Sequence, residues 1–122
     1  MATLNNRSNP KIDFAIFDEM KFVMEGDFDE FLKAFVADSE SRLRQLEEFL
    51  ERKDSIRMAE VAHSFKGSAL NLGAADVARH CYVLESAAKS STLSSRTGAM
   101  KSALADLKQS WASTSSEILK AV

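Results

Sequence analysis

The stretch from Met58 to Gly73 reads MAEVAHSFKGSALNLG. At about 100° per residue, its apolar side chains fall within one narrow arc of a helix: Met58, Val61, Ala62, Phe65, Ala69 and Leu72. Such an arc predicts a helix that buries one face against other elements. Gly73 is a good stop signal directly after this face ends.

The composition of the whole chain favours more helices of the same kind. The 122 residues are enough for one compact domain and too few for two ordinary ones. The chain has one proline and four glycines, which leaves little turn chemistry for hairpins, and no tract alternates with period two. Amphipathic helices with short connections bury their apolar stripes only against each other. We therefore predict an all-α fold, an antiparallel up-down four-helix bundle with an additional N-terminal helix.

Capping and breaking signals divide the chain into these helices. A short first helix is expected after a cap at Asp13 and is broken by Gly26, and Asp27 with Glu30 resembles a capping box. Asp54 is expected to cap the helix that carries the Met58–Gly73 stretch. The remaining expected segments are a long helix over 28–53, a helix over 75–89, a Ser/Thr-rich loop over 90–98 and a final helix over 99–120.

The N-terminal residues, the net charge and the single cysteine narrow the class of protein. Residues 1–11 are polar and predict a flexible N-terminal segment, and residues 12–122 form the predicted domain. A net charge of −2 gives no argument for nucleic acid or for an anionic membrane surface. No run approaches the ~18 apolar residues of a membrane span. Cys81 is the only cysteine, which is compatible with a cytoplasmic setting. Without a long heptad seam, we expect a monomer.

His63 is placed outside the core of its helix. It lies roughly 140° from the centre of the apolar arc, so we do not expect a core histidine. Its neighbours at helical spacing are mostly apolar or small, which is typical of a docking surface. The candidates for partner docking are Ile56, Ala59 and Leu70.

The residue types around His63 suit phosphoryl chemistry. A neutral imidazole offers a nitrogen that can attack a phosphoryl group. Lys66, one turn on, can offset phosphoryl charge. Gly67 costs roughly 0.5–1 kcal/mol inside a helix relative to alanine, which calls for a reason such as access for a bulky partner. Ser68 could assist the phosphoryl group or bond a backbone carbonyl within its helix, and the sequence leaves both open.

These residues resemble the signature of histidine-containing phosphotransfer (HPt) domains. The matching pattern is His63 followed by Lys66-Gly67-Ser68 and then Leu72-Gly73, and it extends to Cys81 and Leu84-Glu85. The resemblance covers about residues 12–120.

The resemblance implies a carrier in a multistep two-component phosphorelay. It would accept a phosphoryl group from a receiver-domain aspartate on His63 and pass it to another receiver. Lys66 would give electrostatic support, and Glu85 would hydrogen-bond the other ring nitrogen and leave Nε2 free. The implied partners are response-regulator receiver domains and a hybrid sensor histidine kinase. Magnesium would belong to the receiver, and no cofactor or metal is expected in this chain.

Other interpretations remain for the same residues. A histidine kinase with its own ATP site is disfavoured, because the chain has no Gly-rich phosphate loop and no second domain, so we expect no autonomous enzyme. A non-catalytic adaptor that binds a partner around His63 is the alternative function. Glu85 could simply pair with Lys89 at i+4 on the surface. A metal site that uses His63 and His80 is disfavoured, since the remaining candidate ligands, Cys81 and Glu85, are not at a recognised spacing.

Overall fold

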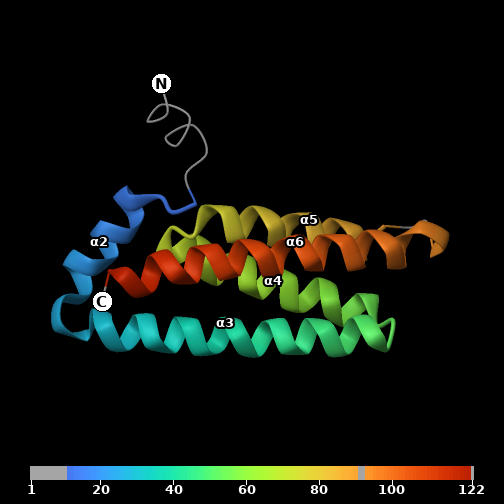
Figure 1. The fold of residues 1–122 in the computed structure, drawn as a ribbon, viewed down its shortest axis with the longest axis horizontal. Helices are drawn as coiled ribbons and strands as arrows, with labels where there is room; N and C mark the ends of the chain where they lie inside the picture. The colour runs from blue at the N-terminus through green and yellow to red at the C-terminus, as the bar shows by residue number, and fades with distance from the viewer. Residues whose placement is uncertain (1–10, 91–92, 122) are drawn as a thin grey trace, which may run out of the picture.

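The computed structural model describes residues 11–90 and 93–121. Its elements are α2 (Phe14–Met24), a 3₁₀ turn η1 (Glu25–Asp27), α3 (Phe28–Glu51), α4 (Ser55–Leu72), α5 (Ala75–Ala88) and α6 (Leu93–Lys120). Helices α3 to α6 lie side by side and alternate in direction, while α2 lies across one end of them (Figure 1). This arrangement confirms the predicted up-down four-helix bundle with an additional N-terminal helix.

The predicted caps at Asp13 and Asp54 are confirmed. The Asp13 carboxylate accepts from the backbone N–H groups of Ala15 and Ile16 at the start of α2, and Asp54 accepts from Arg57 N at 3.1 Å at the start of α4. Each bond satisfies a donor that the helix itself cannot pair. These caps fix where two of the helices begin.

Gly73 ends α4 and also anchors the N-terminal helix. Its φ of 85° lies in the left-handed region that favours glycine. A Cβ here would lie 2.6 Å from the backbone oxygen of Asp13, and the Gly73 carbonyl accepts from Asp13 N at 2.7 Å. The predicted stop signal is confirmed, and the same glycine permits α2 to approach the end of α4.

Two predicted signals between α2 and α3 are wrong. The chain leaves α2 at Glu25, which takes the positive φ of 49°, and Gly26 lies within η1 instead of making the break. Asp27 makes no side-chain cap, because its backbone is already helical at φ −86° and ψ −5°, whereas a capping residue usually has an extended backbone.

The predicted loop over 90–98 is also wrong for most of its length. Helix α6 begins at Leu93, so its first turns include Arg96 and Gly98. The Arg96 guanidinium donates to the carbonyl of Ser90 at 3.1 Å, which ties this end of α6 to the chain leaving α5. Low helix propensity in a short Ser/Thr-rich segment is only a weak preference, and tertiary contacts override it.

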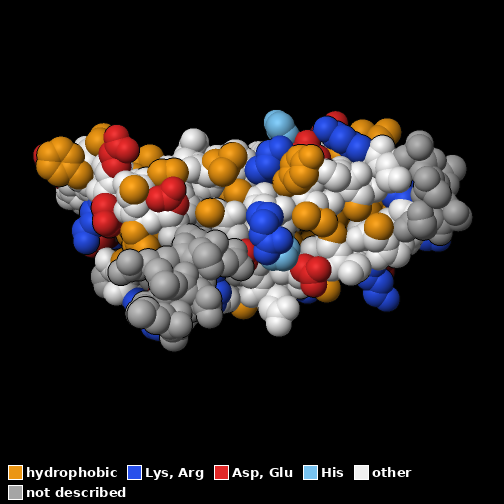
Figure 2. Space-filling view, turned by 90° about the horizontal axis from the view of Figure 1, so that it is seen from above, with side chains coloured by type: hydrophobic (Ala, Val, Ile, Leu, Met, Phe, Trp, Pro, Cys, Tyr) orange, Lys and Arg blue, Asp and Glu red, His pale blue; other side chains and the backbone are white. Residues whose placement is uncertain are grey.

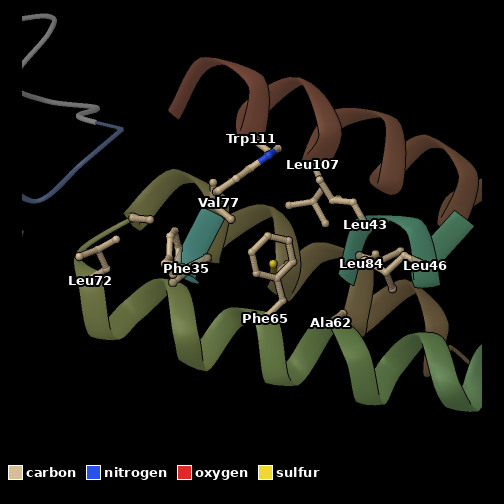
Figure 3. Packing of buried hydrophobic residues seen from close by; sticks show 14 of the residues in the cluster. Phe35, Leu43, Leu46, Ala62, Phe65, Leu72, Val77, Leu84, Leu107 and Trp111 are labelled. Atoms are coloured by element: carbon tan, nitrogen blue, oxygen red, sulfur yellow. The ribbon is translucent and has the colours of Figure 1, made fainter. Parts of the chain in front are cut away.

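The predicted apolar arc of α4 faces the core. Met58, Ala62, Phe65, Ala69 and Leu72 are fully buried and Val61 is partly buried. Phe65 points toward the side of the interior where α6 packs (Figure 3). Each such fully buried large side chain contributes on the order of 1.5–3 kcal/mol from apolar burial. The packing of α4 therefore fixes which of its side chains face outward.

Trp111 anchors α6 in this core. It is 5% exposed, and its ring centroid lies 5.8 Å from that of Phe35 on α3 and 6.1 Å from that of Phe65 on α4. Cys81 on α5 is fully buried in the same core. Helices α3, α4 and α6 thus meet around one tryptophan.

Exposed large apolar side chains occur on α2 and also on α4, α5 and α6. Phe22 and Val23 on α2 are 80% and 69% exposed, and hydrophobic atoms gather at the end of the molecule where α2 lies (Figure 2). Elsewhere on this face apolar side chains alternate with basic and acidic ones.

In the described part of the chain, no helix has the length and hydropathy needed to cross a membrane. The predicted flexible segment lies outside the described residues except for Lys11, which contacts Ser113 on α6.

Candidate functional site

His63 stands on the outer face of α4. Its side chain is 68% exposed, while the residues before and after it in the apolar arc are buried. The imidazole is therefore accessible, yet its backbone is held by a helix that packs on three neighbours. The prediction that His63 is not a core histidine is confirmed.

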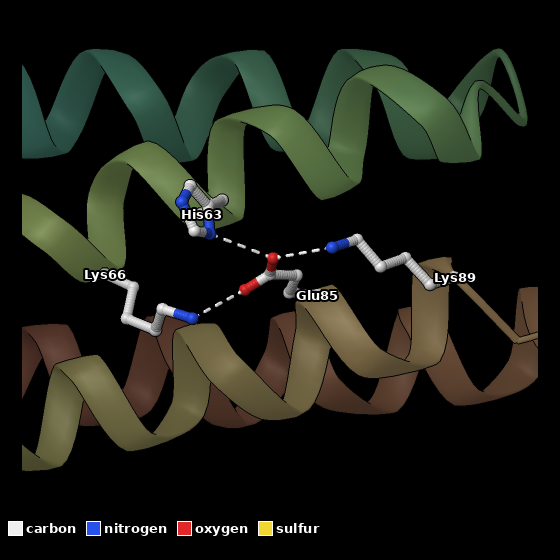
Figure 4. A network of polar contacts seen from close by, with 4 residues as sticks. All are labelled: His63, Lys66, Glu85 and Lys89. Carbon is white, nitrogen blue, oxygen red and sulfur yellow. Dashed lines mark hydrogen bonds and ion pairs between the residues drawn. The ribbon is translucent and has the colours of Figure 1, made fainter.

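Glu85 on α5 meets His63 across the seam between the two helices. Only 6% of Glu85 is exposed, and its Oε2 lies 3.0 Å from His63 Nδ1. Because an ionised carboxylate can only accept, Nδ1 carries the proton of this hydrogen bond in the neutral ring. That tautomer leaves Nε2 with a free electron pair, and Figure 4 shows this nitrogen turned away from Glu85.

Two lysines hold the same carboxylate. Lys66 Nζ donates to Glu85 Oε1 at 2.9 Å from α4, and Lys89 Nζ donates to Oε2 at 2.9 Å from one turn further along α5 (Figure 4). The hydrogen bond from Lys66, with those from Lys89 and His63, holds the pKa of Glu85 at about 2 despite the opposing effect of burial. Glu85 is therefore ionised throughout the physiological pH range.

Lys66 is fixed from more than one side. Its side chain is 23% exposed, and its Nζ lies 5.3 Å from the centroid of the Tyr82 ring, a cation–π distance. Together with the bond to Glu85, this contact links α4 to α5. Lys66 consequently orients the carboxylate that in turn orients His63.

The other two residues of the predicted motif have different surroundings. Gly67 is exposed, and a Cβ built there would meet nothing within 4 Å, so the space beside it is open. Ser68 is half-buried and, within the described residues, forms no hydrogen bond with His63, Lys66 or Glu85. Five residues from His63, it is turned by roughly 140° around the helix. The structure thus keeps Gly67 beside the site and separates Ser68 from it.

A shallow hollow of about 610 Å³ adjoins His63 at the α4–α5 seam. Ile56, Ala59 and Ala88 form its apolar part, and its polar lining includes Glu60, His63, Glu85, Lys89 and Arg96. We call this feature the seam hollow. It places an apolar surface directly beside the accessible imidazole.

The predicted docking residues differ in how much surface they offer. Ile56 is 73% exposed at the seam hollow, and Leu70, one turn beyond Lys66, is 52% exposed. Ala59 is only 7% exposed, because it also packs against the core, so it contributes part of the hollow but little outward surface. Ala59 therefore offers a partner less surface than Ile56 or Leu70 does.

His80 belongs to a separate polar cluster on α5. It lies 3.6 Å from Asp76 Oδ2, the atom that also accepts from Ser110 Oγ at 2.6 Å. Burial raises the pKa of Asp76, but the hydrogen bonds from Ser110 and Arg79 outweigh it and leave the pKa lowered. The side chain of His80 is 18% exposed. Among the described residues, no group of three or more His, Cys, Asp or Glu side chains is placed to hold a metal ion.

Sequence reasoning missed part of the site. The i,i+4 pair of Glu85 with Lys89 is confirmed, but its carboxylate is buried and not on the surface, and Arg96 belongs to α6 and not to a loop. The i,i+4 spacing of Glu85 and Lys89 was the available signal, but it carried no information on the burial of Glu85. Tyr82 gave no signal, since its contact with Lys66 depends on the register between α4 and α5.

Comparison with known proteins agrees with this geometry. The family model described as Hpt domain matches residues 30–113. Among solved structures, the chain resembles histidine-containing phosphotransfer protein B (HptB) from Pseudomonas aeruginosa PAO1, with 30% sequence identity and a TM-score of 0.73, over 91% of this chain and 96% of that one. No curated protein sequence matches the chain. The family model spans more than half of the residues, including His63, Lys66 and Glu85, and the chain therefore belongs to the Hpt domain family.

Proposed function

We propose that this protein carries phosphoryl groups between receiver domains of a phosphorelay, with His63 Nε2 as the phosphorylated atom. The observation that supports the proposal most directly is the 3.0 Å contact between His63 Nδ1 and the buried carboxylate of Glu85. This contact selects the tautomer in which Nε2 is unprotonated. The side chain is at the same time 68% exposed, so a partner can reach it.

The transfer step follows from this tautomer. The Nε2 electron pair attacks the phosphorus of an aspartyl phosphate on the incoming receiver. The N–P bond forms as the P–O bond to the aspartate breaks, and the electron pair of that bond leaves on the aspartate carboxylate. The Nδ1 proton stays in its hydrogen bond to Glu85, which stabilises the positive charge that develops on the ring. The reverse step delivers the phosphoryl group to a second receiver.

The surroundings of His63 fit a protein partner better than a small donor. Gly67 leaves open space one turn from the imidazole, and exposed Ile56 adds apolar surface at the seam hollow. The magnesium ion that phosphoryl transfer from an aspartate requires would be supplied by the receiver. We place the protein in the cytoplasm, as a monomeric carrier that has no ATP site and works between a hybrid sensor kinase and a response regulator.

Transfer from a panel of phosphorylated receiver domains tests the proposal. Label that is acid-labile and alkali-stable is expected on the wild type and absent from His63→Gln. His80→Gln is the matched control, because it removes the other histidine of the chain and leaves His63 intact. Equal labelling of His63→Gln would refute His63 as the acceptor. A wild type that binds receivers but accepts label from none of them would favour the adaptor function.

A further inference from the structure

Glu85 uses its two oxygens differently. Oε1 accepts from Lys66, while Oε2 accepts from both His63 Nδ1 at 3.0 Å and Lys89 Nζ at 2.9 Å. Lys89 and His63 therefore share one acceptor atom. The strength of the bond to the imidazole depends on how much of the negative charge on Oε2 is already neutralised by Lys89.

The two lysines are held to different degrees. Lys66 is 23% exposed and lies against Tyr82, whereas the side chain of Lys89 is 64% exposed at the edge of the seam hollow. Lys66 bridges two helices, while Lys89 pairs within its own helix at i+4. Removing Lys89 consequently changes the charge near Glu85 Oε2 without removing a contact between α4 and α5.

Lys89 is the charged side chain that shares Glu85 Oε2 with His63, and other charged groups nearby have different partners. Within the described residues, Arg42 on α3, Glu60 on α4 and Arg96 on α6 form no ion pair or hydrogen bond with His63 or Glu85. Arg42 bonds Ser64 and Arg96 bonds a backbone carbonyl. His63, Lys66, Glu85 and Lys89 are thus the directly bonded group.

We propose that Lys89 is a positioning residue that sets the pH range over which His63 accepts a phosphoryl group, by sharing Glu85 Oε2 with the imidazole. The inference rests on the proposed function of His63. Without Lys89, Glu85 is less neutralised and a nearby cation is lost, and both changes favour the imidazolium. An imidazolium has no free electron pair at Nε2. Acceptance in a Lys89 variant therefore requires a higher pH.

The test compares three variants over a series of pH values. Lys89→Gln is expected to move the midpoint of the pH profile for phosphoryl acceptance upward by roughly half a pH unit, the size of a partly exposed ion pair. Lys89→Arg keeps the charge and the donor and is expected to restore the wild-type midpoint. Lys120→Gln, which makes the same charge change at the far end of α6, is the matched control. The titration of the His63 ring nitrogens, followed by ¹⁵N NMR in the isolated protein, gives the same comparison without any partner.

The outcomes separate this inference from the proposed function. A midpoint that moves in Lys89→Gln, with an unchanged rate at high pH, supports the positioning role. A midpoint that matches Lys120→Gln overturns it, as does a lower rate at high pH with an unmoved midpoint, which would place Lys89 on the phosphoryl group itself. If no receiver labels the wild type, the proposed function fails, while the NMR titration still decides whether Lys89 controls protonation of His63.

Discussion

At the scale of single residues, the buried carboxylate of Glu85 organises the site. It accepts hydrogen bonds from an imidazole and two ammonium groups that come from two helices. The sequence motif alone placed His63, Lys66 and Gly67 on one helix. The role of Glu85 came only from the resemblance, because the pairing of α4 with α5 depends on packing that no local pattern encodes. The pair of Glu85 with Lys89 followed from their i,i+4 spacing, whereas the bond from Lys66 to the same carboxylate required the structure.

Glu85→Gln tests this organisation through stability and its pH dependence. The amide cannot hold two lysines, and we expect the free energy of unfolding at pH 7 to fall by about 1–3 kcal/mol. The pKa of Glu85 is about 2 in the folded protein against an ordinary 4.5, so its contribution is complete above pH 4.5 and is lost as the pH falls from 4.5 toward 2. The difference between wild type and variant is therefore expected to shrink over that range in urea denaturation.

Glu60→Gln is the matched control for this measurement. Glu60 is exposed on α4, and its removal is expected to change stability by less than about 0.5 kcal/mol. A Glu85→Gln effect that stayed constant from pH 7 to pH 3 would contradict the ionised, hydrogen-bonded state of the carboxylate.

At the scale of helices, the sequence predicts a helix boundary correctly where a residue at that boundary caps or ends the helix itself. Asp13, Asp54 and Gly73 were identified correctly because each serves its own helix end. The break at Glu25 and the early start of α6 at Leu93 could not be read from propensity. At both places packing against neighbouring helices determines the path of the chain. Gly26 and the Ser/Thr-rich run therefore did not predict the helix boundaries.

Gly67→Leu separates access from helix stability on α4. Leucine is the better helix former by about 0.5–1 kcal/mol, and a Cβ at Gly67 would meet nothing within 4 Å. We expect unchanged or increased thermal stability with phosphoryl transfer slowed by roughly tenfold or more, equivalent to about 1.4 kcal/mol of lost complementarity to the partner.

Gly98→Leu on α6 provides the control, since a Cβ there would also meet nothing within 4 Å. It is expected to gain similar stability and to transfer at the wild-type rate. Normal transfer by Gly67→Leu would remove the access explanation for this glycine.

At the scale of the whole molecule, the bundle isolates its single thiol. Cys81 is fully buried in the core, and this burial raises the pKa of its thiol to about 12. We expect modification by a maleimide at pH 8 to be at least roughly 1,000-fold slower than for a free thiol and to accelerate in step with unfolding in urea. Rapid labelling of the folded protein would show that α5 opens locally without global unfolding.

The contacts of Trp111 have a spectroscopic consequence. The chain contains one tryptophan, and its ring packs between Phe35 and Phe65, on the opposite side of α4 from the imidazole. Its fluorescence therefore reports on the assembly of three helices from a position that the chemistry at His63 does not touch. The emission is expected to stay constant on phosphorylation and to change when the helices separate, so that the protein carries an internal optical control that distinguishes altered reactivity from a damaged fold.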